Sequence, residues 1–330
     1  MTAPDAAEGT AGLLREGLRA HLEGELEAAA ARYQQALEQD PDNPTAHNNL
    51  GFLLGQRQDW DRALEHLQRA VTLNPRDANA RSNLGQVLAA TGRTRAGLAH
   101  LEQATEMTPD DPAAWDRLGR LRLASGDAAG AEAAWRRARS LAPRDAHLLV
   151  RLGTALGAQG KLSEAVTALR RATRRAPKDP EAWAQLGMVL WLRRSLDAAQ
   201  QTLERALALA PGHERAARHL AQVHVARQAP EKARQVLEAL LETAPDAHQA
   251  RLDLAVLLLA ADQPAEALGQ LERLEPALAD DSRQRFYHAL ALRGAGREQE
   301  AQALLADLAA GQGDYARRAR ELTHPGGTPP

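Results

Sequence analysis

The sequence predicts an all-α fold built from tandem repeats, each made of two helices joined by a turn. Three observations support this prediction: a strict proline period, two amphipathic segments in each period, and a composition that favours helices. Ala, Leu, Arg, Glu and Gln dominate, whereas aromatic residues make up only 3% of the chain. The evenly spaced prolines, each thirty-four positions after the one before it, are Pro41, Pro75, Pro109, Pro143, Pro177, Pro211 and Pro245.

The proline period divides residues 10–315 into nine repeats of equal length, with each proline at the thirty-second position. Residues 1–9 precede the repeats, and we expect them to form a flexible tail. A terminal repeat leaves one apolar face uncovered, so residues 314–323 are expected to form a short capping helix. The segment 316–330 then comprises the end of this helix and a disordered tail.

Each repeat contains a first helix, a turn and a second helix. In the second repeat, apolar residues between Leu50 and Leu54 mark the first helix, and those between Ala63 and Val71 mark the second. The periodic proline ends the second helix because it lacks the N–H that a continuing helix needs. A glycine is expected to end the first helix in a left-handed conformation. It recurs at Gly24, Gly92, Gly126, Gly160 and Gly296.

Small residues recur inside both helices and predict that the two helices cross closely. A glycine inside a helix costs about 1 kcal/mol relative to alanine, so its recurrence requires a packing reason. The first helices carry Gly17, Gly51, Gly85, Gly119, Gly153 and Gly187. The second helices carry Ala29, Ala63, Ala131, Ala165, Ala199, Ala233, Ala267 and Ala301, with Gly97 in this place once.

Together these residues resemble the tetratricopeptide repeat family, whose pattern places Trp, Leu and Gly in the first helix and Ala, an aromatic residue and Pro after it. The fourth repeat carries the pattern most fully, with Trp115, Leu118, Gly119, Ala131, Trp135, Ala138 and Pro143. The resemblance implies a right-handed α-α superhelix, a solenoid whose first helices line the concave face. The last three repeats depart from the pattern, since alanine replaces the first-helix glycine at Ala221, Ala255 and Ala289.

Composition and motifs indicate no catalytic site. The formal net charge is −2, so the chain lacks the basic excess of a general nucleic-acid binder. It contains no cysteine, which excludes disulfides and thiol nucleophiles. No phosphate-binding loop, nucleophile elbow or zinc-protease motif occurs. We therefore expect no enzyme activity, no cofactor and no metal. We also expect no membrane span, and a cytoplasmic location.

The resemblance implies that the second, fifth, sixth, ninth and twelfth residues of each repeat line the concave face. In the second and third repeats these positions include the amides Asn48, Asn49, Asn83 and Gln86. Such amides are suited to hydrogen-bond the backbone of an extended peptide. The alternative is an ordinary polar helix face exposed to solvent.

In the fourth and fifth repeats the same positions become basic, with Arg117, Arg120 and Arg151. Residues 112–179 hold fourteen basic and six acidic residues, so this zone is suited to an acidic side chain or a C-terminus. The alternative is a solvated run of charges.

From the sixth repeat onward the predicted lining becomes apolar, with Trp191, Leu252, Val256 and Phe286. An exposed apolar patch of this kind typically marks a partner surface and could receive an amphipathic helix. The alternative is that tighter curvature of the superhelix, or a C-terminal helix that folds back, buries these residues within the chain.

These features favour a non-enzymatic scaffold that binds peptides or helices of partner proteins in the concave groove. A second hypothesis is a regulatory subunit that self-associates into a homo-oligomer through the apolar C-terminal surface. Nucleic-acid binding through the basic middle repeats is a third hypothesis and the least favoured, because base stacking requires exposed aromatic residues.

Overall fold

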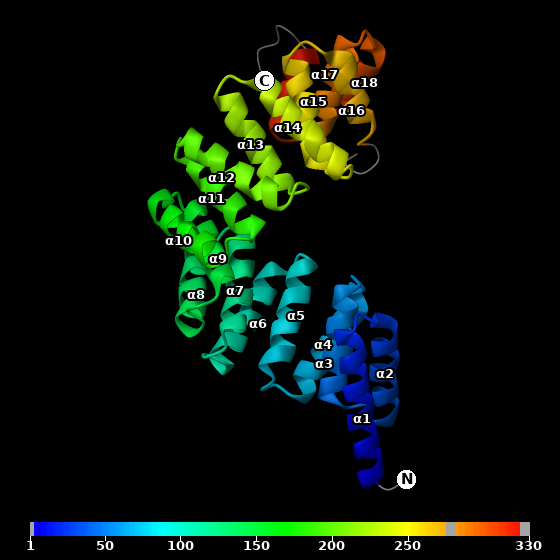
Figure 1. The fold of residues 1–330 in the computed structure, drawn as a ribbon. Coiled ribbons are helices and arrows are strands. Elements are labelled where there is room, and N and C mark those ends of the chain that lie inside the picture. The colour runs from blue at the N-terminus through cyan, green and yellow to red at the C-terminus, as the bar shows by residue number, and fades with distance from the viewer. Residues whose placement is uncertain (1–2, 275–280, 324–330) are drawn as a thin grey trace. The chain divides into compact units, whose positions relative to one another are not determined.

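The computed structural model describes residues 3–274 and 281–323, and every regular element in these ranges is an α-helix (Figure 1). The chain divides into two compact units, Met1–Ala165 and Val166–Pro330, which we call the N-terminal unit and the C-terminal unit. The boundary falls within α10 (Leu162–Arg175). Each unit is described by itself below.

The N-terminal unit holds the first nine helices. They are α1 (Ala3–Leu22), α2 (Leu26–Gln39), α3 (Pro44–Gln56), α4 (Trp60–Leu73), α5 (Ala78–Ala90), α6 (Thr94–Met107), α7 (Pro112–Ala124), α8 (Ala128–Leu141) and α9 (Ala146–Ala158).

The helices after α10 belong to the C-terminal unit. They are α11 (Pro180–Leu192), α12 (Leu196–Leu209), α13 (Glu214–Ala226), α14 (Pro230–Thr243), α15 (His248–Ala260), α16 (Pro264–Glu272), α17 (Ser282–Gly294), α18 (Glu298–Ala309) and α19 (Asp314–Thr323).

The odd-numbered helices from α1 to α17 are the first helices of the predicted repeats, and the even-numbered helices from α2 to α18 are the second helices. From α3 to α17 the first helices begin at a constant interval, which equals the proline period. The predicted all-α fold of tandem helical hairpins is therefore confirmed.

Close crossing of the paired helices explains the glycines inside the first helices. A Cβ atom at Gly119 would lie 2.7 Å from Cε2 of Trp135, and one at Gly187 would lie 2.5 Å from Cγ of Leu203. In the third repeat the two backbones themselves approach closely, because a Cβ at Gly97 would lie 2.5 Å from the carbonyl oxygen of Gly85. This is the repeat in which glycine replaces the usual second-helix alanine. The packing reason predicted for these small residues is confirmed.

The turn between the two helices of a repeat requires a residue with positive φ. The five predicted glycines all adopt this conformation, with φ between 74° and 88°. Four repeats place a side chain there instead, at Gln58, Arg194, Gln228 and Asp262. A residue with a Cβ is strained in the left-handed region, by roughly 1 kcal/mol.

The loop between repeats is fixed by two side chains that the sequence places at regular positions. The residue before most first helices caps the helix, as when the Asp111 carboxylate accepts a hydrogen bond from the Ala113 N–H at 2.9 Å. Four residues later, a side chain donates to the carbonyl oxygen of the periodic proline. Trp115 Nε1 donates to Pro109 O at 3.0 Å. Equivalent contacts join Arg81 to Pro75, Trp183 to Pro177, and Arg251 to Pro245.

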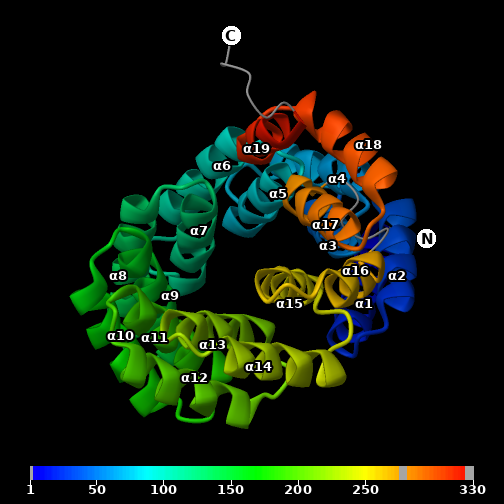
Figure 2. The ribbon, with the colours of Figure 1, turned by 90° about the horizontal axis from the view of Figure 1, so that it is seen from above.

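The larger core clusters of the described residues cross the boundaries between repeats. One cluster in the N-terminal unit extends from Ala20 to Leu88, and one in the C-terminal unit extends from Ala217 to Ala301. Successive first helices also contact each other, as α3 contacts α5 and α13 contacts α15. Within each unit the first helices lie on the inner side and the second helices on the outer side (Figure 2).

Both ends of the described chain depart from or extend the repeat pattern. Helix α1 begins at Ala3, so most of the segment predicted to be a flexible tail is helical. Its alanine-rich sequence favours this extension. Helix α19 occupies residues 314–323, the range expected for a capping helix. The predicted disordered tail beyond it lies outside the described residues.

None of the helices in the ranges 3–274 and 281–323 combines the length and the apolar character that crossing a membrane requires.

Candidate functional site

In the described ranges, each unit has a hollow formed mainly by its first helices. In the N-terminal unit, α3, α5 and α7 enclose a space of about 420 Å³, which we call the amide–arginine groove. Its lining residues are Asn48, Asn49, Phe52, Asn79, Asn83, Gln86, Arg117 and Arg120. The structure therefore brings together the four predicted amides and two of the three predicted arginines.

The amides of this groove are connected across neighbouring repeats. Asn83 Nδ2 donates to Asn48 Oδ1 at 2.9 Å, and Asn48 Nδ2 donates to Asn49 Oδ1 at 3.3 Å. In the described part of the chain, Asn49 Nδ2 and Asn83 Oδ1 form no hydrogen bond with protein atoms. These two groups are half-buried yet able to donate to and accept from a ligand backbone.

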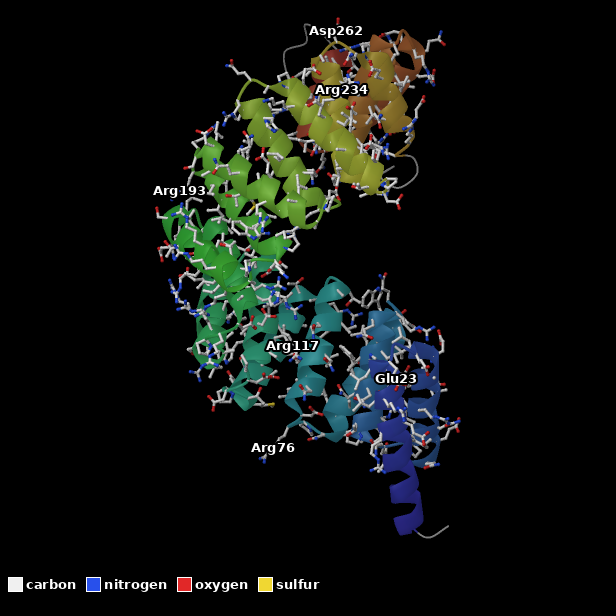
Figure 3. All side chains as sticks on the ribbon, viewed as in Figure 1. Glu23, Arg76, Arg117, Arg193, Arg234 and Asp262 are labelled. Atoms are coloured by element: carbon white, nitrogen blue, oxygen red, sulfur yellow. The ribbon has the colours of Figure 1, made fainter. Side chains whose placement is uncertain are left out.

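The predicted basic zone is partly neutralised by Asp116 on α7. Its carboxylate lies 3.3 Å from Nε of Arg120 and 3.7 Å from Nε of Arg151, and it accepts a hydrogen bond from Trp135 Nε1 at 2.8 Å. Sequence reasoning missed this residue, although Asp116 stands four positions before Arg120, where side chains on a helix meet. Among the described residues Arg117 (Figure 3) forms no ion pair, so it is the cation of the groove least compensated by the protein.

In the C-terminal unit, α11, α13, α15 and α17 enclose a space of about 360 Å³, which we call the apolar–arginine pocket. One wall is apolar and includes Trp191, Val225, Val256 and Leu257. Trp191 and Val256 were predicted to line the concave face, and Val225 is 47% exposed. The remaining lining residues are Arg194, Arg218, Ala221, Gln222, Ala226, Leu237, Asp253 and Arg283.

The polar side of this pocket is a three-residue ionic network. Asp253 Oδ2 lies 2.6 Å from Nε of Arg218, and Asp253 Oδ1 lies 2.8 Å from Nη2 of Arg283. Burial alone would lower the pKa of Arg283, but its hydrogen bond with Asp253 raises that pKa above its ordinary value. The carboxylate thus holds two guanidinium groups from different helices in fixed positions.

Sequence reasoning did not identify Arg218, Asp253 or Arg283. The signal that could have found them is their spacing, because Arg218 and Asp253 lie 35 residues apart and Asp253 and Arg283 lie 30 apart. Both separations are close to one repeat length, so these charges fall on adjacent first helices.

The Trp191 ring is supported by a half-buried histidine. The centroids of the Trp191 and His219 rings lie 6.3 Å apart, and His219 Nδ1 lies 3.2 Å from Gln222 Oε1. Burial lowers the pKa of His219, which keeps its imidazole neutral at pH 7.

The prediction that Leu252 and Phe286 line the concave face is wrong, because both residues lie in the core. Leu252 has no exposed surface and packs within the cluster that extends from Ala217 to Ala301. Phe286 is 6% exposed, and its ring centroid lies 5.5 Å from that of Tyr315 on α19. For Phe286 the alternative interpretation holds, since the C-terminal helix covers it.

In the described ranges, no three His, Asp or Glu side chains gather in a group that could hold a metal ion.

The family model described as Cilia and flagella-associated protein 70 C-terminal domain matches residues 2–221, and the Tetratricopeptide repeat model matches residues 228–290. The comparison with curated proteins finds no match.

Several solved structures share the fold. A tetratricopeptide repeat protein from Parabacteroides merdae has a TM-score of 0.62 at 13% identity, covering 76% of this chain and 99% of that one. Yeast Tom70 has a TM-score of 0.61 at 16% identity, covering 89% and 63%. Pseudomonas aeruginosa pilF has a TM-score of 0.57 at 19% identity, covering 66% and 99%. At these identities the likeness establishes the fold alone.

The strict repeat, the helical hairpins and the two family models agree, and the chain belongs to the tetratricopeptide repeat family, within the branch described as the Cilia and flagella-associated protein 70 C-terminal domain.

Proposed function

We propose that the chain is a non-enzymatic scaffold that binds peptide segments or helices of partner proteins on the inner side of its units. The observation that supports this most strongly is the occurrence, on first helices of both units, of a hollow lined by side chains suited to a peptide. The repeats of this family form a protein-interaction fold, and concave surfaces are where such arrays bind. We also propose a cytoplasmic location.

The two hollows differ in the ligand chemistry they favour. The amide–arginine groove offers amide donors and acceptors with Arg117, which suits an extended backbone with an acidic group. The apolar–arginine pocket offers apolar walls, which suit a large side chain. A partner that contacts both surfaces would gain affinity by engaging two sites on one chain.

Site-specific photo-crosslinking in the native cell tests this function. A photoreactive amino acid replaces Gln86 in the groove or Val225 in the pocket, and both positions are expected to capture partner proteins. Matched control positions are Glu106 on α6 and Gln201 on α12, which are exposed on second helices. Equal capture from the second-helix positions would contradict binding on the inner side.

The self-association hypothesis is weakened by the burial of Leu252 and Phe286, because the apolar surface on which it relied is smaller than expected. Light scattering of the full chain and of a truncation ending at residue 247 tests it. Self-association that disappears in the truncation would favour this alternative over the scaffold.

A further inference from the structure

The apolar–arginine pocket carries more positive charge than the protein itself compensates. Three arginines line it, Arg194, Arg218 and Arg283, against the single carboxylate of Asp253. In the described part of the chain, Arg194 forms no ion pair, and the terminal nitrogens of Arg218 form no hydrogen bond. A guanidinium carries five N–H donors, so donors remain available beside the apolar wall.

We propose that this pocket binds an internal peptide segment of a partner protein in which an acidic side chain neighbours a large apolar side chain. The inference rests on the proposed scaffold function and specifies the ligand of one of its two surfaces.

The apolar wall accounts for the apolar side chain. Trp191, Val225, Val256 and Leu257 come from three successive first helices and surround about 360 Å³. This volume lies at the low end of the range for ligand pockets, about 300 to 1,000 Å³, so it suits one large side chain and its neighbour. Val225 is 47% exposed in the chain alone, and covering it removes apolar surface from water.

The arginines account for the acidic neighbour. Arginine binds carboxylates in a fixed planar geometry, and Asp253 already holds Arg218 and Arg283 in place at 2.6 and 2.8 Å. These side chains are only 24% and 31% exposed, so little side-chain freedom is lost when a ligand binds. A basic peptide would meet three like charges and be rejected.

Selection of displayed random 12-residue peptides on the full chain tests the inference. The peptides recovered are expected to contain Asp or Glu beside Leu, Phe or Trp. Replacing the acidic residue of a recovered peptide by its amide should weaken binding by about tenfold, which is the loss of one charge-assisted hydrogen bond. Amidating the C-terminus of the peptide should leave the affinity unchanged.

Two matched pairs of variants locate the binding site. Val225→Ser should weaken binding by about tenfold, whereas Leu192→Ser should not, although Leu192 is 44% exposed and equally apolar. Arg194→Gln should weaken binding of acidic peptides, whereas the adjacent Arg193→Gln should not, because Arg193 (Figure 3) is exposed outside the pocket. All four positions are exposed at the surface, so these variants are expected to fold.

Three outcomes would overturn the inference, and they differ in what else they imply. If the recovered peptides need a free C-terminal carboxylate, the ligand of the pocket is the C-terminus of a partner protein and not an internal segment. Peptides unaffected by the pocket variants but lost in Asn83→Ala or Arg117→Gln would bind the amide–arginine groove, which leaves the scaffold function intact. Recovery of no peptide at either surface would contradict both proposals.

Discussion

The side chain at a helix crossing decides how closely the two helices of a repeat approach. Gly119 faces the ring of Trp135, and glycine leaves room that any other residue would fill. Gly269 on α16 also lies inside a helix, but a Cβ at this position would have no atom within 4 Å. The same residue type therefore serves packing at one position and not at the other.

Replacing each glycine by alanine should change stability in opposite directions. Gly119→Ala should destabilise the chain by about 1–3 kcal/mol, because its Cβ would lie 2.7 Å from Trp135. Gly269→Ala should stabilise it by about 0.5–1 kcal/mol through helix propensity alone. Chemical denaturation followed by circular dichroism measures both changes. If Gly119→Ala were as stable as the native chain, close crossing would not explain the recurring glycines.

The burial of individual side chains on the concave face was the part of the site that the sequence predicted least well. Leu252, Phe286 and Arg218 all occupy the fifth position of a repeat. That position lies where successive first helices contact, so a leucine or phenylalanine turns into the core while an arginine extends to the surface. The ninth position, occupied by Val256 and Gln86, lines the hollows in both units. A position number within a repeat therefore predicts a face of the helix but not the burial of each side chain.

At the scale of the element, the period predicts nearly all of the helices, because proline and glycine act locally on the backbone. The first helices keep the same spacing even in the last two repeats, where the proline is lost. The side-chain hydrogen bonds to the carbonyl of the periodic proline were not predicted, because the residue that donates them varies in type. Trp115, Arg81 and Arg251 each donate this hydrogen bond in their own repeat. What they share is a hydrogen-bond donor, which no simple motif describes.

Removing one of these hydrogen bonds should lower the stability of the chain, because each one joins two successive repeats. Trp183→Phe removes the hydrogen bond from Nε1 to Pro177 O and leaves that carbonyl without its side-chain donor, at a cost of about 0.5–1.5 kcal/mol. Trp60→Phe is the matched control, because Trp60 is also half-buried and, in the described part of the chain, its Nε1 forms no hydrogen bond. Thermal melting of both variants measures the difference. Equal losses in the two variants would assign the effect to ring size alone.

At the scale of the whole molecule, stability is distributed along stacked repeats, and the larger core clusters each span several repeats. Titratable groups in both units therefore contribute to the stability of the chain. Burial is the main cause that lowers the pKa of four histidines, and they are His66, His100, His219 and His224. The carboxylates titrate at lower pH than the histidines. The hydrogen bond with His213, for example, holds the pKa of Glu181 at about 2.

The chain should therefore lose stability as the pH falls below about 6.5, before its carboxylates titrate. A histidine whose pKa is lowered by folding binds more protons in the unfolded chain, so its contribution is fully present above the unfolded pKa and is lost as pH falls toward the folded pKa. Melting temperatures between pH 7.5 and pH 5 measure this slope. His219→Gln and His224→Gln should each reduce this dependence of the melting temperature on pH. A melting temperature that rises on acidification over this range would show that these imidazoles are charged in the folded chain.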